Sequence, residues 1–255
     1  MSKAILDADV IAYMASVGAE AHDGVFGEDD AATHLEAATQ RADEMVVGWM
    51  EAAECTASKL AFSGSSADNF RRSVHPQYKH NRSGEKPEDY YEVVQYLKDN
   101  YLTASVDELE GDDILGMHMG NDWIAVSTDK DMRTVPGQFV HIRYDGSIDR
   151  YNTTLEMGNH FWMWQTLQGD TVDGYKGCPG CGRKGATSTL PYVGATLSRL
   201  WDSVVGRYEE AWRKPKMKAK FITGHPYDEA LMNARVARIL RDGDYTDTGV
   251  KLWNP

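Results

Sequence analysis

The sequence predicts an α/β protein with a central, mostly parallel sheet flanked by helices, followed by a helical C-terminal region. In the first part of the chain, short apolar runs that end in polar or acidic residues alternate with amphipathic helical segments, which is the order typical of a parallel sheet. After residue 153 the apolar positions follow helical spacing as far as residue 241. We therefore expect an α/β core over residues 1–155 and a helical region over residues 156–255.

The expected strands and helices of the first domain alternate along the chain. Residues 3–6 form an apolar run that predicts a strand, and Asp9 is expected to cap the helix that follows. Residues 30–54 carry apolar side chains three and four positions apart, which predicts a long amphipathic helix. Further buried strands are expected at residues 59–62 and 123–127.

The remaining elements of this domain complete the α/β pattern. Helices are expected at residues 88–100 and from Gly111 onward. Residues 139–144 and 147–151 predict a hairpin, because Asp145-Gly146 between them is a favoured turn dipeptide.

Length, charge and cysteine content restrict the class of protein. The 255 residues are 42% hydrophobic, which is enough for a sizeable core, and they include no run long enough to cross a membrane and no signal peptide at the start. The three cysteines do not form the framework of a secreted disulfide protein. We expect a cytoplasmic monomer without a membrane partner. The net charge of -12 argues against a simple nucleic-acid coat, but acidic residues can be concentrated at a metal site.

Acidic residues recur where the predicted strands end or helices begin. They are Asp7, Glu110, Asp112, Asp113, Asp129, Asp131, Asp170 and Asp173. Ligand sites of open α/β sheets lie outside the carboxyl ends of the strands, so these side chains are expected to converge. Crowded carboxylates raise one another's pKa unless cations lie among them, and oxygen ligands suit Mg²⁺ or Mn²⁺. Two such ions activate water for phosphodiester hydrolysis. A single aspartate at such a position is more often a cap, so the prediction rests on the whole set.

Several segments, in this order, resemble the 5′ nuclease superfamily, which contains phage 5′→3′ exonucleases, flap endonucleases and the 5′ nuclease domains of bacterial DNA polymerases. The matching segments are residues 5–9 (ILDAD), 69–72 (NFRR), 78–82 (YKHNR), 110–113 (EGDD), 127–131 (STDKD), 169–174 (GDTVDG) and 177–186 (GCPGCGRKGA). The resemblance implies a PIN-like 5′ nuclease core and a C-terminal helix–three-turn–helix region.

The resemblance also implies which carboxylates hold metal. Asp7, Glu110, Asp112 and Asp113 would serve the first Mg²⁺ or Mn²⁺ ion, and Asp129, Asp131, Asp170 and Asp173 the second. Many relatives carry a further aspartate after the second strand, where this chain has Ser63-Gly64-Ser65-Ser66. Asp68 is the candidate to replace that ligand.

The DNA-contacting residues follow from the same resemblance. Lys79 and Arg82 match a basic pair near the scissile phosphate, where positive charge stabilises the transition state, and Tyr78 is a candidate for stacking on a terminal base. The remaining expected DNA contacts are Arg71, Arg72, Gly177, Gly180, Gly182 and Lys184. Backbone amides of the glycine-rich segment would approach phosphates, and its turn would hold K⁺. The alternative is that residues 71–86 form only a solvated basic loop.

Cys178 and Cys181 lie within the glycine-rich segment as a CxxC pair. Half a zinc site is disfavoured because no second pair of ligands lies nearby in the sequence. Packing is the better interpretation, since relatives carry small apolar residues at these positions.

Together these features predict a 5′→3′ exonuclease or structure-specific 5′ flap endonuclease of phage DNA replication or degradation, acting in the host cytoplasm. Its expected substrates are duplex or flapped DNA, with RNA/DNA hybrid as a further candidate. Two alternatives remain: a PIN-type RNase, which would not need residues 177–186, and a non-catalytic DNA-binding scaffold.

Overall fold

The computed structural model describes residues 2–26, 31–81, 84–120 and 122–255, and the chain divides into two compact units. The first unit comprises Met1–Ser66, Gly84–Met132 and Gly137–Asn152, and the second comprises Ala67–Ser83, Arg133–Pro136 and Thr153–Pro255. The second unit thus includes residues 67–83, which the sequence-based division placed with the α/β core.

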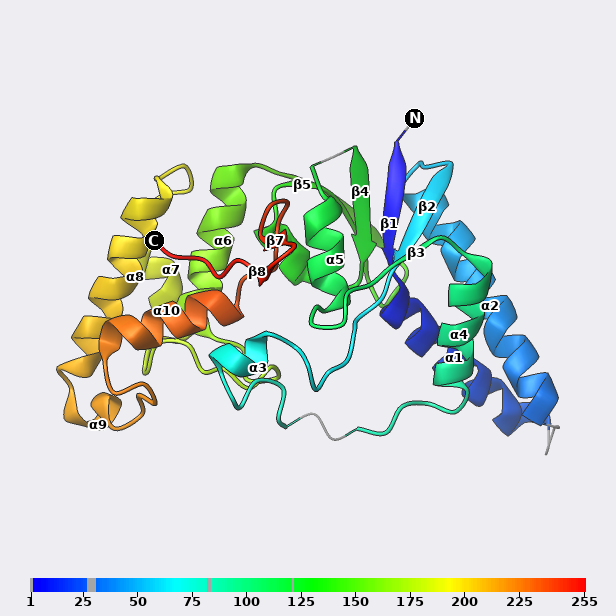
Figure 1. Cartoon of the computed structure of the whole chain (residues 1–255), viewed down its shortest axis with the longest axis horizontal. Coiled ribbons are helices and arrows are strands. Elements are labelled where there is room, and N and C mark those ends of the chain that lie inside the picture. The colour runs from blue at the N-terminus through cyan, green and yellow to red at the C-terminus, as the bar shows by residue number, and fades with distance from the viewer. Residues whose placement is uncertain (1, 27–30, 82–83, 121) are drawn as a thin grey trace. The chain divides into compact units, whose positions relative to one another are not determined.

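The first unit is built on a six-stranded sheet with the strand order β3-β2-β1-β4-β5-β6 (Figure 1). The strands are β1 (Lys3–Asp7), β2 (Ala57–Ala61), β3 (Thr103–Ala104), β4 (Trp123–Ser127), β5 (Gly137–Ile142) and β6 (Ile148–Thr153). Pairing is parallel between β1 and β2, β1 and β4, β2 and β3, and β4 and β5. The predicted α/β class with a mostly parallel central sheet is confirmed.

The central position of β1 explains its apolar sequence. Strands lie on both sides of it, and Ala4, Ile5 and Leu6 are fully buried. Alternate residues of a strand face opposite sides of the sheet, so a strand covered on both faces needs a continuous apolar run. The buried strand predicted at residues 3–6 is therefore confirmed.

Helices cover both faces of this sheet. On one face, α1 (Ala8–Phe26), α2 (Ala31–Ala52) and α4 (Tyr90–Asn100) pack on one another. They share a core with the sheet, in which Leu6, Leu60 and Val126 meet apolar side chains of the helices. The short helix α5 (Gly111–His118) packs against β1, β2 and β4.

The predicted hairpin is present as β5 and β6, which are neighbours in the sheet. Arg143 N donates to Ser147 O at 2.9 Å, and Asp145 Oδ1 accepts from Ser147 N at 2.9 Å. Gly146 has a φ of 80°, a conformation that glycine adopts without steric cost. Asp145-Gly146 therefore acts as the turn that the sequence indicated.

The second unit is helical, with a small two-stranded sheet of β7 (Tyr245–Thr246) and β8 (Gly249–Val250). Its helices are α3 (Arg71–Val74), α6 (Leu155–Gln168), α7 (Gly182–Thr189), α8 (Leu197–Trp212), α9 (Pro215–Lys218) and α10 (Pro226–Val236) (Figure 1). Among the described residues, no helix is long and apolar enough to span a membrane.

Trp162 of α6 is at the centre of the second core. The side chain is fully buried, and its Nε1 donates to Ala234 O at 2.8 Å. The ring meets Trp253 edge-on with centroids 4.8 Å apart, and the Arg238 guanidinium lies 4.7 Å from its centroid. One side chain therefore joins α6 to α10 and to the C-terminal segment.

Trp162→Ala should lower the free energy of unfolding by about 3–5 kcal/mol, because it leaves a cavity and an unpaired Ala234 carbonyl. Trp164→Ala, on the same helix, is the matched control, since the Trp164 side chain is only half-buried and its Nε1 donates to the exposed Thr187. Urea unfolding followed by circular dichroism compares the two variants. Equal losses would show that Trp162 does not hold the unit together.

Candidate active site

Asp7 is the last residue of β1, and its side chain is only 5% exposed. Its Oδ2 accepts a hydrogen bond from Ser127 Oγ at 2.6 Å, and its Oδ1 accepts from Val10 N at 3.3 Å. Because α1 begins at Ala8, Asp7 occupies the capping position. The expectation that Asp9 caps this helix is wrong, since the helix begins two residues earlier, at Ala8 instead of Val10.

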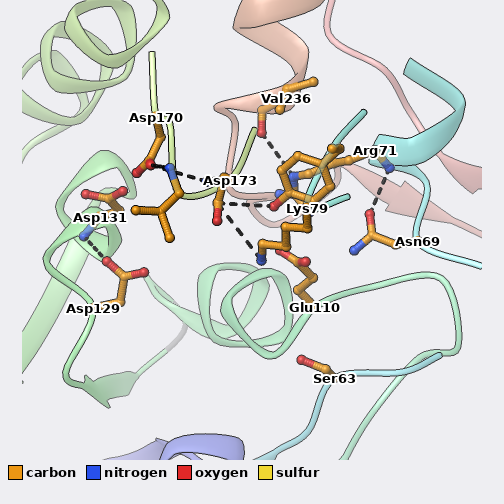
Figure 2. A network of polar contacts seen from close by, with 12 residues as sticks. Ser63, Asn69, Arg71, Lys79, Glu110, Asp129, Asp131, Asp170, Asp173 and Val236 are labelled. Carbon is orange, nitrogen blue, oxygen red and sulfur yellow. Dashed lines mark hydrogen bonds and ion pairs between the residues drawn. The ribbon is translucent and has the colours of Figure 1, made fainter. Parts of the chain in front are cut away.

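A relay of hydrogen bonds connects Asp7 to the carboxylates after β4. Parallel pairing places Leu6 beside Val126, so the two strands end at the same edge of the sheet. Ser127 Oγ accepts from Asp129 N at 3.0 Å. Asp129 Oδ1 in turn accepts from Asp131 N at 2.8 Å (Figure 2). Asp131 lies in the 3₁₀-helix Lys130–Thr134 and its Oδ1 is 3.5 Å from Lys130 Nζ.

The environment of Asp7 opposes its ionisation. Burial is the largest cause and the negative charge of Asp9 the second, and together they raise the pKa of Asp7 to about 7 despite the hydrogen bond from Ser127. The charge of Asp129 acts in the same direction. A divalent cation beside these oxygens would favour the ionised form, so the donor set fits a hard metal ion.

Asp9 contributes a carboxylate that the sequence reasoning did not assign to the site. Its Oδ2 accepts from Ser63 N at 2.8 Å, and its Oδ1 accepts from Tyr90 Oη at 3.4 Å. A Cβ added to Gly111 would lie 3.2 Å from Asp9 Oδ2, so glycine lets the start of α5 approach this carboxylate. The Asp7-Ala8-Asp9 spacing was the signal that could have identified it.

Ser63 follows β2, at the position where the family resemblance implied a further aspartate. Its Oγ accepts from Gly111 N at 2.9 Å, so Ser63 links the end of β2 to the beginning of α5. Asp68, the suggested replacement, is exposed and belongs to the second unit. Within the first unit, the carboxylate of Asp9 is bonded to Ser63 N.

Two of the carboxylates at the start of α5 form a capping box. Asp113 Oδ2 accepts from Glu110 N at 3.2 Å, and the Glu110 side chain accepts from the backbone of Asp113. Asp113 is fully buried, whereas Asp112 is half-buried. Helix capping is therefore sufficient to explain the presence of Glu110 and Asp113. It does not explain Asp112, the third carboxylate of this segment.

In the second unit, Asp170 and Asp173 lie in a tight loop after α6. Gly169 and Gly177 have φ values of 75° and 62°, and a Cβ on either would lie 2.3 Å from the backbone nitrogen of the other. Inside this closure, Asp170 Oδ1 accepts from Val172 N at 2.8 Å and from Asp173 N at 3.3 Å. The loop is therefore shaped by its own backbone and by the Asp170 side chain.

The basic segment that contains Lys79 docks on this loop (Figure 2). Lys79 N donates to Asp173 O at 2.9 Å, and Lys79 Nζ lies 4.0 Å from Asp173 Oδ2. Asn81 Nδ2 donates to Thr171 O at 3.2 Å. A Cβ on Gly174 would lie 2.7 Å from Gln77 O, so this glycine permits the close contact. Lys79 and Asp173 are thus positioned together.

Two of the residues expected to contact DNA have structural roles instead. Tyr78 is 3% exposed, packs in the core of the second unit and donates from Oη to Asp173 Oδ2 at 3.4 Å, so its ring is not presented for base stacking. Arg71 is 2% exposed and donates to Val236 O at 3.0 Å and to Arg238 O at 2.7 Å (Figure 2). Both side chains are buried in the second unit, where they bond to residues that are distant in the sequence.

Of the other basic candidates, Arg72 is half-buried on α3, and Arg82 lies outside the described residues. Arg72 therefore has side-chain surface that a DNA backbone could contact, whereas Arg71 beside it does not.

The glycine-rich segment before α7 presents only part of its backbone. Gly177 is buried and its N–H donates to Asn233 Oδ1 at 3.1 Å, so this amide is already bonded within the protein. Gly180 is exposed, and a Cβ there would lie 2.9 Å from Met217 Sδ. Gly182 has open space around it, and Lys184 on the first turn of α7 is exposed.

The eight predicted carboxylates thus divide into six in the first unit and two in the second. Among the residues that the structure describes, no three His, Cys, Asp or Glu side chains lie close enough to hold a metal ion together. The assignment of particular residues to two ions stays a prediction.

Comparison with known proteins identifies the family. The chain is 30% identical to the exodeoxyribonuclease of Enterobacteria phage T3, over 77% of this chain and 72% of the relative. It is 29% identical to the exonuclease of Escherichia phage T7, over 77% of this chain and 73% of that protein.

Solved structures show the same fold. The crystal structure of the T5 D15 protein co-crystallized with metal ions matches with a TM-score of 0.52 and 13% identity, covering 92% of this chain and 100% of that one. No protein-family model matches the chain. The identity to the T3 protein, together with the share of both chains that it covers, shows that this protein belongs to the phage exonucleases of the 5′ nuclease superfamily.

Proposed function

We propose that this protein is a divalent-metal-dependent nuclease that hydrolyses DNA phosphodiesters from a 5′ end, as a 5′→3′ exonuclease and 5′ flap endonuclease. The observation that carries the proposal is the buried Asp7, hydrogen-bonded through Ser127 to Asp129 at the carboxyl edge of a parallel sheet. Burying a carboxylate beside two others costs stability unless it serves a ligand. The names of the T3 and T7 relatives, exodeoxyribonuclease and exonuclease, support DNA as the substrate.

The carboxylates of the first unit are the proposed metal donors. Asp7, Asp112 and Asp129 would hold the ions, and Asp9 would support them through its bond to Ser63. Mg²⁺ or Mn²⁺ bound there would activate a water and stabilise the leaving oxygen. The T5 D15 protein, which shares the fold, was co-crystallized with metal ions, and this supports metal binding here.

The second unit would supply substrate contacts. The Lys79 ammonium would bind a phosphate of the substrate and stabilise negative charge that develops on it. Asp173 fixes the Lys79 backbone, and Tyr78 holds the Asp173 carboxylate, so both act as positioning residues for that contact. Exposed Gly182 and Lys184 at the start of α7 would contact a second phosphate of the duplex.

The finer parts of the proposal concern substrate and setting. Phosphate recognition by charge does not distinguish sugars, so RNA in an RNA/DNA hybrid is included as a substrate. A K⁺ ion held by backbone oxygens after α6 would serve duplex binding. We place the activity in phage DNA replication or degradation in the host cytoplasm, carried out by the monomer.

Asp129→Ala should lower the rate of 5′ cleavage at least about a hundredfold. The reason is that the substitution removes a carboxylate that would bind the metal directly, and not a residue that only orients such a carboxylate. End-labelled 5′-flap, blunt duplex and RNA/DNA hybrid substrates with Mg²⁺ measure the rates, and EDTA should abolish all of them. Asp99→Ala, an exposed position on α4, is the matched control and should cleave at the wild-type rate.

The two alternatives have distinct outcomes in that assay. DNA binding without cleavage by the wild-type protein would establish a scaffold. Cleavage of RNA but not of DNA would establish an RNase of the PIN type.

Asp7→Asn should abolish cleavage and yet stabilise the metal-free protein above pH 7. The folded protein binds the Asp7 proton more tightly than the unfolded chain, whose pKa is near 3.8. The stability cost of ionisation therefore grows as the pH rises from about 4 to 7 and is complete above 7.

Thermal unfolding in EDTA at pH 5 and pH 8 measures this difference. The advantage of Asp7→Asn over wild type should be larger at pH 8 than at pH 5, and Mg²⁺ should stabilise the wild type more than the variant. A variant that is less stable than wild type at both pH values would show that Asp7 is a purely structural cap.

A further inference from the structure

The Cys178-Pro179-Gly180-Cys181 turn before α7 brings two thiols together. Cys181 N donates to Cys178 O at 3.0 Å, which closes a four-residue turn. Gly180, its third residue, has a φ of 74°, and proline occupies the second position, which is the signature of a type II turn. Such a turn holds its first and last Cα atoms within about 7 Å, close to the separation that a disulfide requires. The Cys178 thiol donates to Arg207 O with Sγ 3.6 Å from the oxygen, which connects this turn to α8.

The two cysteines differ in environment. Cys178 is 2% exposed and packs in the core of the second unit, whereas Cys181 is half-buried and is the residue that precedes α7. The neighbouring Cys178 thiol is the largest cause that holds the pKa of Cys181 below its ordinary value; burial opposes this shift, and the positive charge of Arg207 adds to it. The neighbouring Cys181 and burial raise the pKa of the Cys178 thiol.

Arg207 of α8 is fixed beside this turn. Its Nη2 donates to Gly180 O at 3.4 Å, and its Nη1 donates to Glu210 Oε2 at 2.8 Å. The guanidinium is therefore held where it can stabilise a thiolate on Cys181. A reactive cysteine is typically a partly exposed thiolate beside a cation, whereas a buried thiol among apolar groups is inert.

We propose that Cys178 and Cys181 form a peroxide-reactive dithiol site, in which Cys181 is the attacking sulfur and Cys178 the resolving one. The Cys181 thiolate attacks one oxygen of hydrogen peroxide, the O–O bond breaks, and with one proton the products are a sulfenic acid and water. The Cys178 thiol then attacks the Cys181 sulfur, an S–S bond forms, and the hydroxyl leaves with the Cys178 proton as water. Two electrons pass from the sulfurs to the peroxide.

The site is independent of the nuclease proposal, since its chemistry needs neither metal nor DNA. Cys55, the remaining cysteine of the sequence, is an internal reference. It is buried, and burial together with the charge of Glu54 raises the pKa of its thiol. Cys55 should therefore react slowly with the same oxidant.

The experiment treats the reduced, full-length protein with hydrogen peroxide, alkylates the remaining thiols with iodoacetamide, and maps the peptides by mass spectrometry without reduction. The expected result is a peptide that contains Cys178 and Cys181 joined by a disulfide, while Cys55 remains alkylated. Before oxidation, Cys181 should react with iodoacetamide at least about tenfold faster than Cys55. Phenylarsine oxide, which bridges paired thiols, should block the Cys178–Cys181 pair alone.

Two variants test the division of roles. Cys178→Ala, which keeps a small apolar side chain in the core, should leave Cys181 as a sulfenic acid that dimedone traps, and circular dichroism checks that it folds. Cys55→Ser should form the disulfide as the wild type does. Oxidation of Cys55 as fast as Cys181, or a Cys178–Cys181 pair that stays reduced under peroxide in the folded wild type, would overturn the proposal.

Discussion

The burial of Asp7 is the constraint on which the proposed site depends. Parallel pairing of β1 with both β2 and β4 makes β1 the centre of its sheet and carries its last residue out of solvent. The carboxylate satisfies its oxygens with Ser127 and Val10, but Asp9 and Asp129 oppose its charge. A bound ligand can offset the repulsion among these carboxylates, and their oxygen atoms are the donors that a hard cation prefers.

Small and polar residues hold the partners of Asp7 in place. Ser127 orients both Asp7 and Asp129, and Ser63 connects Asp9 to the first residue of α5. Gly111 allows that helix to begin close to Asp9. The sheet thus supplies the position of each carboxylate, and hydroxyl groups supply its orientation.

The second unit uses backbone closure for the same purpose. Gly169 and Gly177 bring the ends of one loop together, and that loop receives Lys79. Positive φ values at both glycines make the closure possible, and any side chain there would meet backbone at 2.3 Å. Lys79 and Asp173 are thereby held beside each other before any substrate binds. This lowers the entropic cost of binding a substrate group with them.

The order of the elements was readable from the sequence because it depends on local pattern. A few neighbouring residues are enough to recognise the apolar run of β4 at Trp123–Ser127, the helical spacing of α2 and the Asp145-Gly146 turn. Asp7 and Asp129 could be predicted for the same reason, since each lies at the end of an apolar run.

Tertiary structure decided what each of these residues touches. Tyr78, Arg71 and Gly177 look like substrate-facing residues in the sequence, yet Asp173, Val236 and Asn233 engage them inside the second unit. Conversely, Asp9 reads as a cap and is bonded instead to Ser63, 54 positions away. The sequence by itself determined which segments become strands, helices and turns, because those choices follow from neighbours along the chain. Which side chains face a partner and which face solvent was settled only by contacts between distant segments, whose desolvation and hydrogen bonding no local pattern encodes.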